Sequence, residues 1–182
     1  DTEFDSAQGI PQFALNGHPF YLKTLFRGDD ECLEGNELSP HSKLGGAAFM
    51  KMGCRASGQQ FRLRLVPRGG DFHLKTSFGG ENLCLEGNRF SDKAFLGGAA
   101  FMSPCTGGRA YQPGMLWNFV PSERDGYFHL KNRYRGQNEC LEGNQVSDQA
   151  PLGGAAFMSP CTGQSGTGQS GMLWKLVPIS GG

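Results

Sequence analysis

Three glutamates occupy the same position in a motif that the sequence contains three times. Each follows Cys-Leu and precedes Gly-Asn, and the resulting pairs are Glu34 with Asn36, Glu86 with Asn88, and Glu142 with Asn144. A carboxylate beside an amide can take up the paired hydroxyl groups of a sugar, because together they offer acceptors and donors. The motif therefore leads to the hypothesis of three similar sites that bind carbohydrate.

Residues that follow each motif can complete such a site. Asp92 and Asp148 lie at matching positions in the second and third copies, whereas the first copy lacks an acid there. The segment Leu-Gly-Gly-Ala-Ala-Phe-Met is identical in all copies, and its Phe101 and Phe157 can supply a flat apolar surface for the C–H face of a sugar. The second and third copies are the better candidates.

A purely structural role of the motif is the competing interpretation. Glu followed by Gly-Asn can bond to the backbone of its own turn, with the asparagine at positive φ. Phe101 and Phe157 can equally belong to the hydrophobic core. Folding alone would then account for the threefold identity, and the sequence is compatible with both interpretations.

The six cysteines form one pair in each copy. The pairs are Cys32/Cys54, Cys84/Cys105 and Cys140/Cys161. Many connectivities are possible, but the repetition favours the one that joins each copy to itself. Three such disulfides, each contributing about 3 kcal/mol, indicate an oxidising compartment and hence a secreted or extracellular surface protein.

Four short strands are expected in each copy. In the second copy they are Phe72–Thr76, a segment around Cys84-Leu85-Glu86, the second half of the glycine-rich segment, and Trp117–Pro121. Alternating apolar and polar residues support the first and the last of these. Four strands repeated with a period of about fifty residues predict an all-β fold, the β-trefoil, in which three repeats share one core around a pseudo-threefold axis.

The repeats cover most of the chain. We expect a single β-trefoil domain at 17–182, with repeats at about 17–68, 69–124 and 125–182. Residues 1–16 match nothing later in the sequence, and we interpret them as an N-terminal extension along the surface of the domain.

Several classes of function find no support in the sequence. The formal net charge is zero, which gives no reason to expect a nucleic acid partner, and no apolar stretch is long enough to span a membrane. His73 and His129 occupy corresponding positions in the second and third copies, but the first copy has Tyr21 there. A threefold metal site is therefore not expected. We expect no metal, no cofactor and no enzymatic activity, because no nucleophile, base and orienting partner recur together.

The three copies also resemble the ricin B-type (R-type) lectins. In that family Cys-Leu-Asp opens a repeat, a second cysteine follows about twenty residues later, and Gln-x-Trp lies near the end. This chain has Cys-Leu-Glu and the second cysteine in every copy, but it ends its copies with Gln-Gln-Phe, Met-Leu-Trp and Met-Leu-Trp. The resemblance implies the β-trefoil fold and binding of sugars.

The resemblance also implies particular site residues. The acid that accepts hydrogen bonds from sugar hydroxyls corresponds to Glu34, Glu86 and Glu142. The aromatic two residues before the second cysteine falls on Met52, Ser103 and Ser159, which cannot stack on a sugar. Within the same expected strand, the nearest aromatics are the phenylalanines of the identical segment.

Two hypotheses of function follow. The first is a secreted, non-catalytic module that binds glycans through two or three equivalent shallow sites, with Glu34, Asn36, Glu86, Asn88, Asp92, Phe101, Glu142, Asn144, Asp148 and Phe157 as site residues. The alternative is a structural building block of an extracellular homo-oligomer, in which residues 1–16 dock on a neighbouring copy. Glycan binding and the size of the particle in solution distinguish the two.

Overall fold

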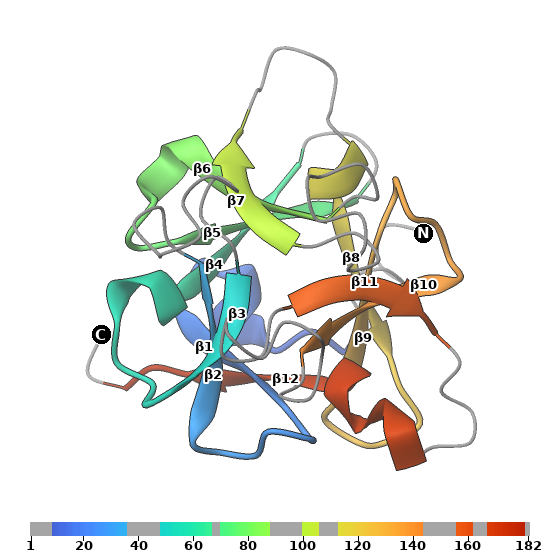
Figure 1. The fold of residues 1–182 in the computed structure, drawn as a ribbon. Coiled ribbons are helices and arrows are strands. Elements are labelled where there is room, and N and C mark those ends of the chain that lie inside the picture. The colour runs from blue at the N-terminus through green and yellow to red at the C-terminus, as the bar shows by residue number, and fades with distance from the viewer. Residues whose placement is uncertain are drawn as a thin grey trace.

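The computed structural model describes residues 9–35, 48–66, 70–87, 100–105, 113–143, 156–161 and 167–180. Within these ranges the chain forms twelve strands of five residues each, one short α-helix and four short 3-10 helices (Figure 1). Four strands belong to each repeat. The predicted all-β class and the four-stranded repeats are thus confirmed.

Six strands close a barrel. Around the barrel they follow the order β1 (Phe20–Thr24), β12 (Trp174–Pro178), β9 (Phe128–Asn132), β8 (Trp117–Pro121), β5 (Phe72–Thr76) and β4 (Phe61–Leu65), each antiparallel to its neighbours. These are the first and last strands of the three repeats. Closure leaves the barrel without free edges.

The other six strands form three separate hairpins. They are β2–β3 (Glu31–Gly35 and Ala48–Met52), β6–β7 (Leu83–Gly87 and Ala100–Pro104) and β10–β11 (Glu139–Gly143 and Ala156–Pro160). Strands β3, β7 and β11 contact one another, so the hairpins gather about one axis. This arrangement is the β-trefoil.

Four 3-10 helices connect these strands. They are η2 (Ser57–Gln59), η3 (Gly80–Asn82), η5 (Pro113–Met115) and η8 (Thr167–Met172). Helix η2 contacts β2, η5 contacts β6, and η8 contacts β10, so each hairpin has a 3-10 turn of its own repeat packed against it.

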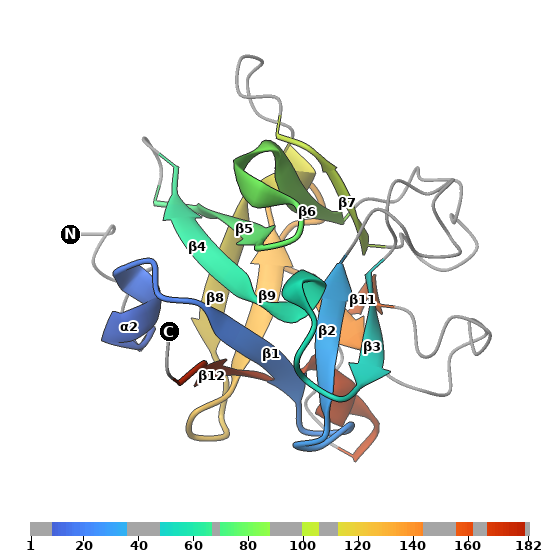
Figure 2. The same ribbon diagram turned by 90° about the vertical axis from the view of Figure 1, so that its left-hand side faces the viewer.

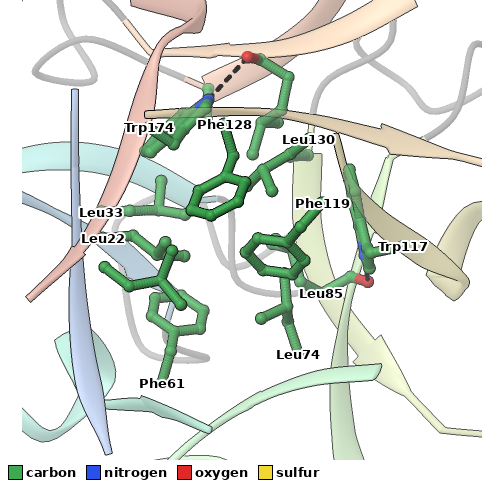
Figure 3. Close-up of a cluster of buried hydrophobic side chains, with 14 of the residues drawn as sticks. Leu22, Leu33, Phe61, Leu74, Leu85, Trp117, Phe119, Phe128, Leu130 and Trp174 are labelled. Atoms are coloured by element: carbon green, nitrogen blue, oxygen red, sulfur yellow. Dashed lines mark hydrogen bonds between the residues drawn. The ribbon is translucent and has the colours of Figure 1, made fainter. Parts of the chain in front are cut away.

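The core is built from the alternation that the sequence predicts. In β1, Phe20, Leu22 and Thr24 are buried, whereas Tyr21 and Lys23 are half-buried. The same pattern recurs in β5 and β9. Aromatic and leucine side chains from all three repeats converge in the interior, as Figure 3 shows.

The hairpins interlock around the axis through glycine and methionine. A Cβ atom added to the glycine that ends the first strand of one hairpin would meet the methionine sulfur of another repeat: Gly35 with Met102 at 2.6 Å, Gly87 with Met158 at 2.9 Å, and Gly143 with Met50 at 2.8 Å. Each repeat therefore receives a side chain from one neighbour and gives one to the other. The threefold identity of these glycines follows from packing.

Gly35, Gly87 and Gly143 are the last residues of β2, β6 and β10 and are buried. Their φ angles do not lie in the left-handed region. Only the absence of a side chain, not a special backbone conformation, makes glycine necessary there.

The three disulfides join the predicted pairs. Cys32–Cys54, Cys84–Cys105 and Cys140–Cys161 have Cα atoms 5.5, 5.3 and 5.3 Å apart. The first cysteine of each pair lies in β2, β6 or β10, and its partner lies beyond the third strand of the repeat. Each disulfide thus holds one hairpin to the chain that leaves it.

The described part of the N-terminal segment packs on the barrel. Helix α2 (Gln12–Leu15) contacts β4 and β12, and Ile10 and Ala14 are buried in the core. Figure 2 shows α2 at the end of the barrel away from β2 and β3. Residues 9–16 are therefore bound to their own domain. Among the described residues, no helix is long and apolar enough to cross a membrane.

Candidate functional site

Each hairpin brings a glutamate and a phenylalanine face to face. In the antiparallel registers, Glu34 lies opposite Phe49, Glu86 opposite Phe101, and Glu142 opposite Phe157. Side chains of directly opposed residues point to the same side of a hairpin, about 5 Å apart at Cβ. The carboxylate and the aromatic surface that the sequence suggests thus come together three times.

These pairs lie on the side of the hairpin that faces away from the core. The neighbouring pair in each hairpin is a leucine opposite a methionine, and these two side chains point inward. In the second copy they are Leu85 and Met102, which are fully buried. Glu86, Phe101, Glu142 and Phe157 are half-buried. The phenylalanines therefore keep part of their rings at the surface, and the interpretation of them as purely core residues is not supported.

The first copy differs in the exposure of its acid. Glu34 is only 8% exposed, whereas the corresponding glutamates of the other two copies are half-buried. The preference for the second and third copies as sugar sites agrees with this difference. The remaining predicted site residues, Asn36, Asn88, Asp92, Asn144 and Asp148, lie outside the described residues.

The 3-10 turn η5 packs beside Glu86 in the second repeat. A Cβ atom added to Gly114 in η5 would lie 2.8 Å from the carbonyl oxygen of Gly87 and 3.2 Å from Cγ of Glu86. Glu86 is thus held between the turn and its own hairpin. A larger residue at position 114 would push against the backbone of the site.

Tryptophan ties the barrel to the hairpin in two copies. The indole N–H of Trp117 donates to the carbonyl of Leu85, and that of Trp174 donates to the carbonyl of Leu141, both at 2.8 Å. These leucines directly precede Glu86 and Glu142. The bonds fix the backbone at the candidate sites, which favours a preorganised surface.

The first copy uses glutamine for the same purpose. Gln59 is fully buried, and its side-chain amide donates to the carbonyls of Cys32 and Lys51 at 3.4 and 3.3 Å. Its oxygen accepts from the backbone N–H groups of Arg55 and Ala56, both at 2.9 Å. One side chain thus joins both strands of the hairpin to the turn that follows it.

The register also corrects the alignment of the first copy. By counting back from the second cysteine, Met52 corresponds to Ser103 and Ser159, but the strand pairs show otherwise. Lys51 lies opposite Cys32, just as Ser103 lies opposite Cys84 and Ser159 opposite Cys140. The first copy has one additional residue, Gly53, at a φ of +86°. Lys51 is therefore the structural counterpart of the two serines.

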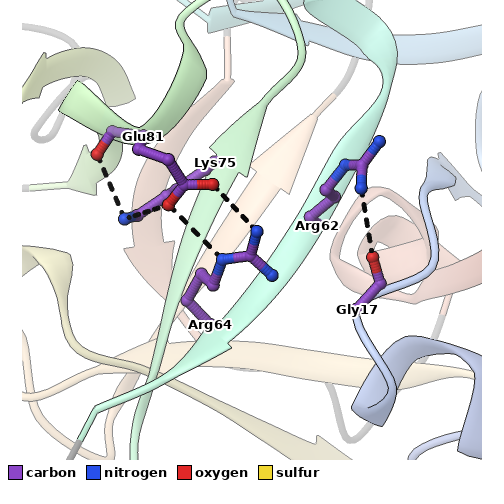
Figure 4. Close-up of polar contacts among 5 residues, drawn as sticks. All are labelled: Gly17, Arg62, Arg64, Lys75 and Glu81. Atoms are coloured by element: carbon purple, nitrogen blue, oxygen red, sulfur yellow. Dashed lines mark hydrogen bonds and ion pairs between the residues drawn. The ribbon is translucent and has the colours of Figure 1, made fainter.

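The part of the chain that the structure describes contains several ion pairs between repeats. Arg64 and Lys75 both bind the carboxylate of Glu81 (Figure 4), and the hydrogen bond from Arg64, followed by that from Lys75, lowers the pKa of Glu81 to about 2. Arg62 donates to the carbonyl of Gly17 in the same view. The buried Asp71 pairs with Arg133. These contacts join barrel strands or the residues next to them, and none of them involves a strand of the three hairpins.

The two histidines at matching positions, His73 and His129, are half-buried. Burial, followed by the charge of Lys75, lowers the pKa of His73. Burial, followed by the charge of Lys131, also lowers the pKa of His129. Within the described ranges, no group of three or more histidine, cysteine, aspartate or glutamate residues is placed to hold a metal ion.

Comparison with known proteins gives similarity in structure only. No protein family model and no curated protein sequence matches the chain. Among solved structures, the designed threefold symmetric protein ThreeFoil matches with a TM-score of 0.63 and 19% identity, over 88% of this chain and 99% of the other.

Two natural proteins show the same similarity. A ricin B-like lectin from Macrolepiota procera, solved in complex with lactose, matches with a TM-score of 0.58 and 11% identity, over 90% of this chain and 96% of the lectin. An exo-β-1,3-galactanase from Clostridium thermocellum matches with a TM-score of 0.62 and 18% identity, over 89% of this chain but only 30% of the enzyme.

These matches confirm the fold. The chain has the β-trefoil fold of ricin B-like lectins, as the resemblance in its sequence implied. The same fold also occurs as a minor part of an enzyme chain. Identities below one fifth establish no function, which has to be argued from the site itself.

Proposed function

We propose that the chain is a non-catalytic carbohydrate-binding module whose two equivalent sites are the outward faces of hairpins β6–β7 and β10–β11. The observation that carries this proposal is the repeated pairing of Glu86 with Phe101 and of Glu142 with Phe157 in one register. The carboxylate accepts hydrogen bonds from sugar hydroxyls, and the ring packs on the C–H face.

Geometry around the pairs supports this role. The tryptophan bonds to Leu85 and Leu141 hold the backbone beside each glutamate, so little ordering is needed when a sugar binds. Asn88, Asp92, Asn144 and Asp148 follow these strands in sequence and are proposed to complete the sites. The similar ricin B-like lectin was solved with lactose, which makes galactosides the first ligands to test.

Two weak sites on one rigid body can give useful binding to a branched glycan. Once the first site is occupied, the second meets its sugar at a high effective concentration, without any new contact. We therefore expect stronger binding to multivalent glycans than to single sugars. Three disulfides suit a module that acts in an oxidising, extracellular environment.

The alternative, a building block of an assembly, has less support. Ile10 and Ala14 of the N-terminal segment are buried in the core of the same chain, so this part is not available to dock on a neighbour. The size of the full chain in solution, measured by light scattering, tests the remaining forms of that alternative.

A glycan array followed by calorimetry with the best ligand tests the proposal. The double variant Glu86→Gln and Glu142→Gln keeps the shape of both side chains but removes their charge. We expect its affinity to fall by about tenfold or more, because hydrogen bonds to charged groups contribute about 1.5–3 kcal/mol each. The single variants should each retain one site and lose mainly the gain from multivalency.

Glu123→Gln is the matched control, since Glu123 is an exposed carboxylate on the turn between β8 and β9. It should bind as the unmodified chain does. Absence of any glycan ligand at millimolar concentration, or equal binding by the double variant, would contradict the proposed function.

A further inference from the structure

The first hairpin carries positive charge where the other two carry hydroxyl groups. Lys51 is the counterpart of Ser103 and Ser159, and Arg55, directly after the second cysteine, corresponds to threonine in both other copies. Lys51 and Arg55 are both exposed. None of the ion pairs found among the described residues involves either of them.

Both cations lie beside one disulfide. Lys51 is opposite Cys32 in the hairpin, and Arg55 follows Cys54, which is bonded to Cys32. Alternation along the strands puts Lys51 on the same side of the hairpin as Phe49 and Glu34. Lys51 thus lies beside the pair of Glu34 and Phe49, and Arg55 lies close to it in the chain, at the disulfide.

A buried side chain, Gln59, holds the backbone of both residues in place. Gln59 donates to the carbonyl of Lys51 and accepts from the N–H of Arg55, so both residues are bound by the same buried side chain. A pair of cations on a preorganised backbone loses less entropy on binding an anion than two independent surface side chains do.

An exposed aromatic ring from the next repeat adjoins the same turn. The backbone N–H of Phe78 donates to the carbonyl of Ser57 at 3.2 Å, and the Phe78 side chain is 38% exposed. Ser57 is the first residue of η2, and Gln59 is its last. The first repeat thus offers two cations and a nearby apolar ring, whereas its own glutamate is largely withdrawn from solvent.

We propose that the first hairpin is a separate binding site for an acidic saccharide, in which Lys51 and Arg55 bind a carboxylate or sulfate group and Phe78 packs on the sugar ring. The guanidinium group can bind either anion in a bidentate manner, and the ammonium group adds a second point charge. This inference rests on the proposed function and extends it: the molecule binds neutral sugars at two hairpins and an acidic sugar at the third.

Besides Glu34, the exposed acid Asp30 lies near the site and reduces its positive charge. The carbonyl of Asp30 accepts a hydrogen bond from the N–H of Gly53, which places this exposed residue at the same end of the hairpin. Asn82 and Asn138 occupy the equivalent positions and accept the corresponding bonds from Cys105 and Cys161. Asp30→Asn therefore removes a negative charge with a residue that the fold already accepts there.

Calorimetry with three probes tests the proposal: a sulfated heparin tetrasaccharide, tetragalacturonate, and the uncharged galactan tetrasaccharide. Binding of at least one charged probe is expected, and the two probes distinguish sulfate from carboxylate recognition. Lys51→Ser with Arg55→Thr, which copies the chemistry of the second repeat, should weaken that binding about tenfold or more. It should leave binding of a neutral ligand at the other hairpins unchanged.

Two further variants sharpen the test. Asp30→Asn should strengthen binding of the charged probe a few-fold, and the affinity should fall as salt rises from about 50 to 200 mM. Arg124→Thr with Lys131→Ser removes two cations elsewhere and should have no effect. Thermal unfolding of every variant shows that each one is folded.

The outcomes separate this inference from the function on which it rests. Neutral sugars that bind while neither charged probe does, or a charged probe that binds equally to the Lys51/Arg55 variant, would overturn the acidic site alone. If no saccharide of either kind binds, the proposed function fails as well. A loss of binding as large in the Arg124/Lys131 variant would reduce the interaction to unspecific charge attraction and would also overturn it.

Discussion

The hairpin of the first repeat and the hairpins of the other two share one backbone but differ in chemistry. All three have the same register, the same disulfide and the same glycine and methionine at the axis. At the outer end, the first has Lys51, the additional Gly53 and the buried Gln59, whereas the others have serine, no added residue and methionine. The inner end of each hairpin, where its glycine and methionine contact other repeats, is set by packing. The outer end, beside the disulfide, differs among the copies.

This contrast separates what holds the fold from what distinguishes the sites. Identical residues gather where the repeats touch one another, and they include the leucine and methionine that point inward. Residues that differ gather where solvent is close. Identity at the inward-pointing positions therefore marks structure, whereas the identical pairs of glutamate and phenylalanine face outward and are the candidate ligand groups.

The largest effect is expected from the disulfides, and it should be equal in all repeats. Replacing both cysteines of one pair by alanine should lower the free energy of unfolding by about 3 kcal/mol, since each bridge closes a loop of similar length. Denaturant titration of the Cys32/Cys54 and Cys84/Cys105 variants measures this. Costs that differ by more than about 1 kcal/mol would show that the inner scaffold is not equivalent among the repeats.

A smaller effect on stability should distinguish the two kinds of hydrogen bond to the hairpins, from Gln59 in the first repeat and from tryptophan in the others. Gln59→Met gives the first repeat the residue of the others and should cost about 2 kcal/mol, because buried backbone groups lose their partners. Trp117→Phe removes a single hydrogen bond and should cost about 1 kcal/mol. Denaturant titration again provides the measurement.

Gln60→Leu is the control for the first of these variants. It also replaces a residue of the first repeat by that of the others, but Gln60 is only half-buried, and the hydrogen bonds found for it use its backbone N–H and carbonyl groups. It should change stability by less than about 0.5 kcal/mol. If Gln59→Met is equally harmless, Gln59 does not organise the first hairpin.

The smallest expected effect is a loss of stability at acidic pH that involves two of the three repeats. The pKa values of His73 and His129 are lowered in the folded chain, so below about pH 6.5 the unfolded chain binds protons that the folded chain does not. Well above that pH both states hold these histidines neutral, and their titration does not affect stability. As the pH falls below it, protons bind to the unfolded chain and the free energy of unfolding decreases. The first repeat has Tyr21 at this position and lacks the effect.

Thermal unfolding between pH 7.5 and pH 5 checks this prediction. His73→Tyr with His129→Tyr should flatten the decline of the unfolding temperature, and Tyr21→His should steepen it. A slope that is the same in all three chains would mean that these histidines are protonated equally in the folded and unfolded states.

Much of the fold can be predicted from the sequence, because strands and core depend on local patterns. The alternation at Phe20–Thr24, Phe72–Thr76 and Trp117–Pro121 predicts strands with the observed bounds. The period of the cysteines predicts the disulfides. Both signals lie within one repeat and need no knowledge of how distant segments meet.

The site could be predicted only in part, since it depends on register. The pairing of Glu86 with Phe101 joins residues from two strands, and no pattern within either strand states which residues oppose each other. The role of Gly87 depends on Met158 of another repeat, which is a contact across the axis. One signal was available, because aligning the three copies at the identical Ala-Ala-Phe-Met segment puts Lys51 against Ser103 and Ser159.

The glycine and methionine contacts run in one sense around the axis, and both halves of each contact are the same in every repeat. Any repeat can consequently follow any other without a mismatched joint at the centre. Exchanging whole repeats should therefore transfer the ligand chemistry of one hairpin without disturbing the contacts at the axis.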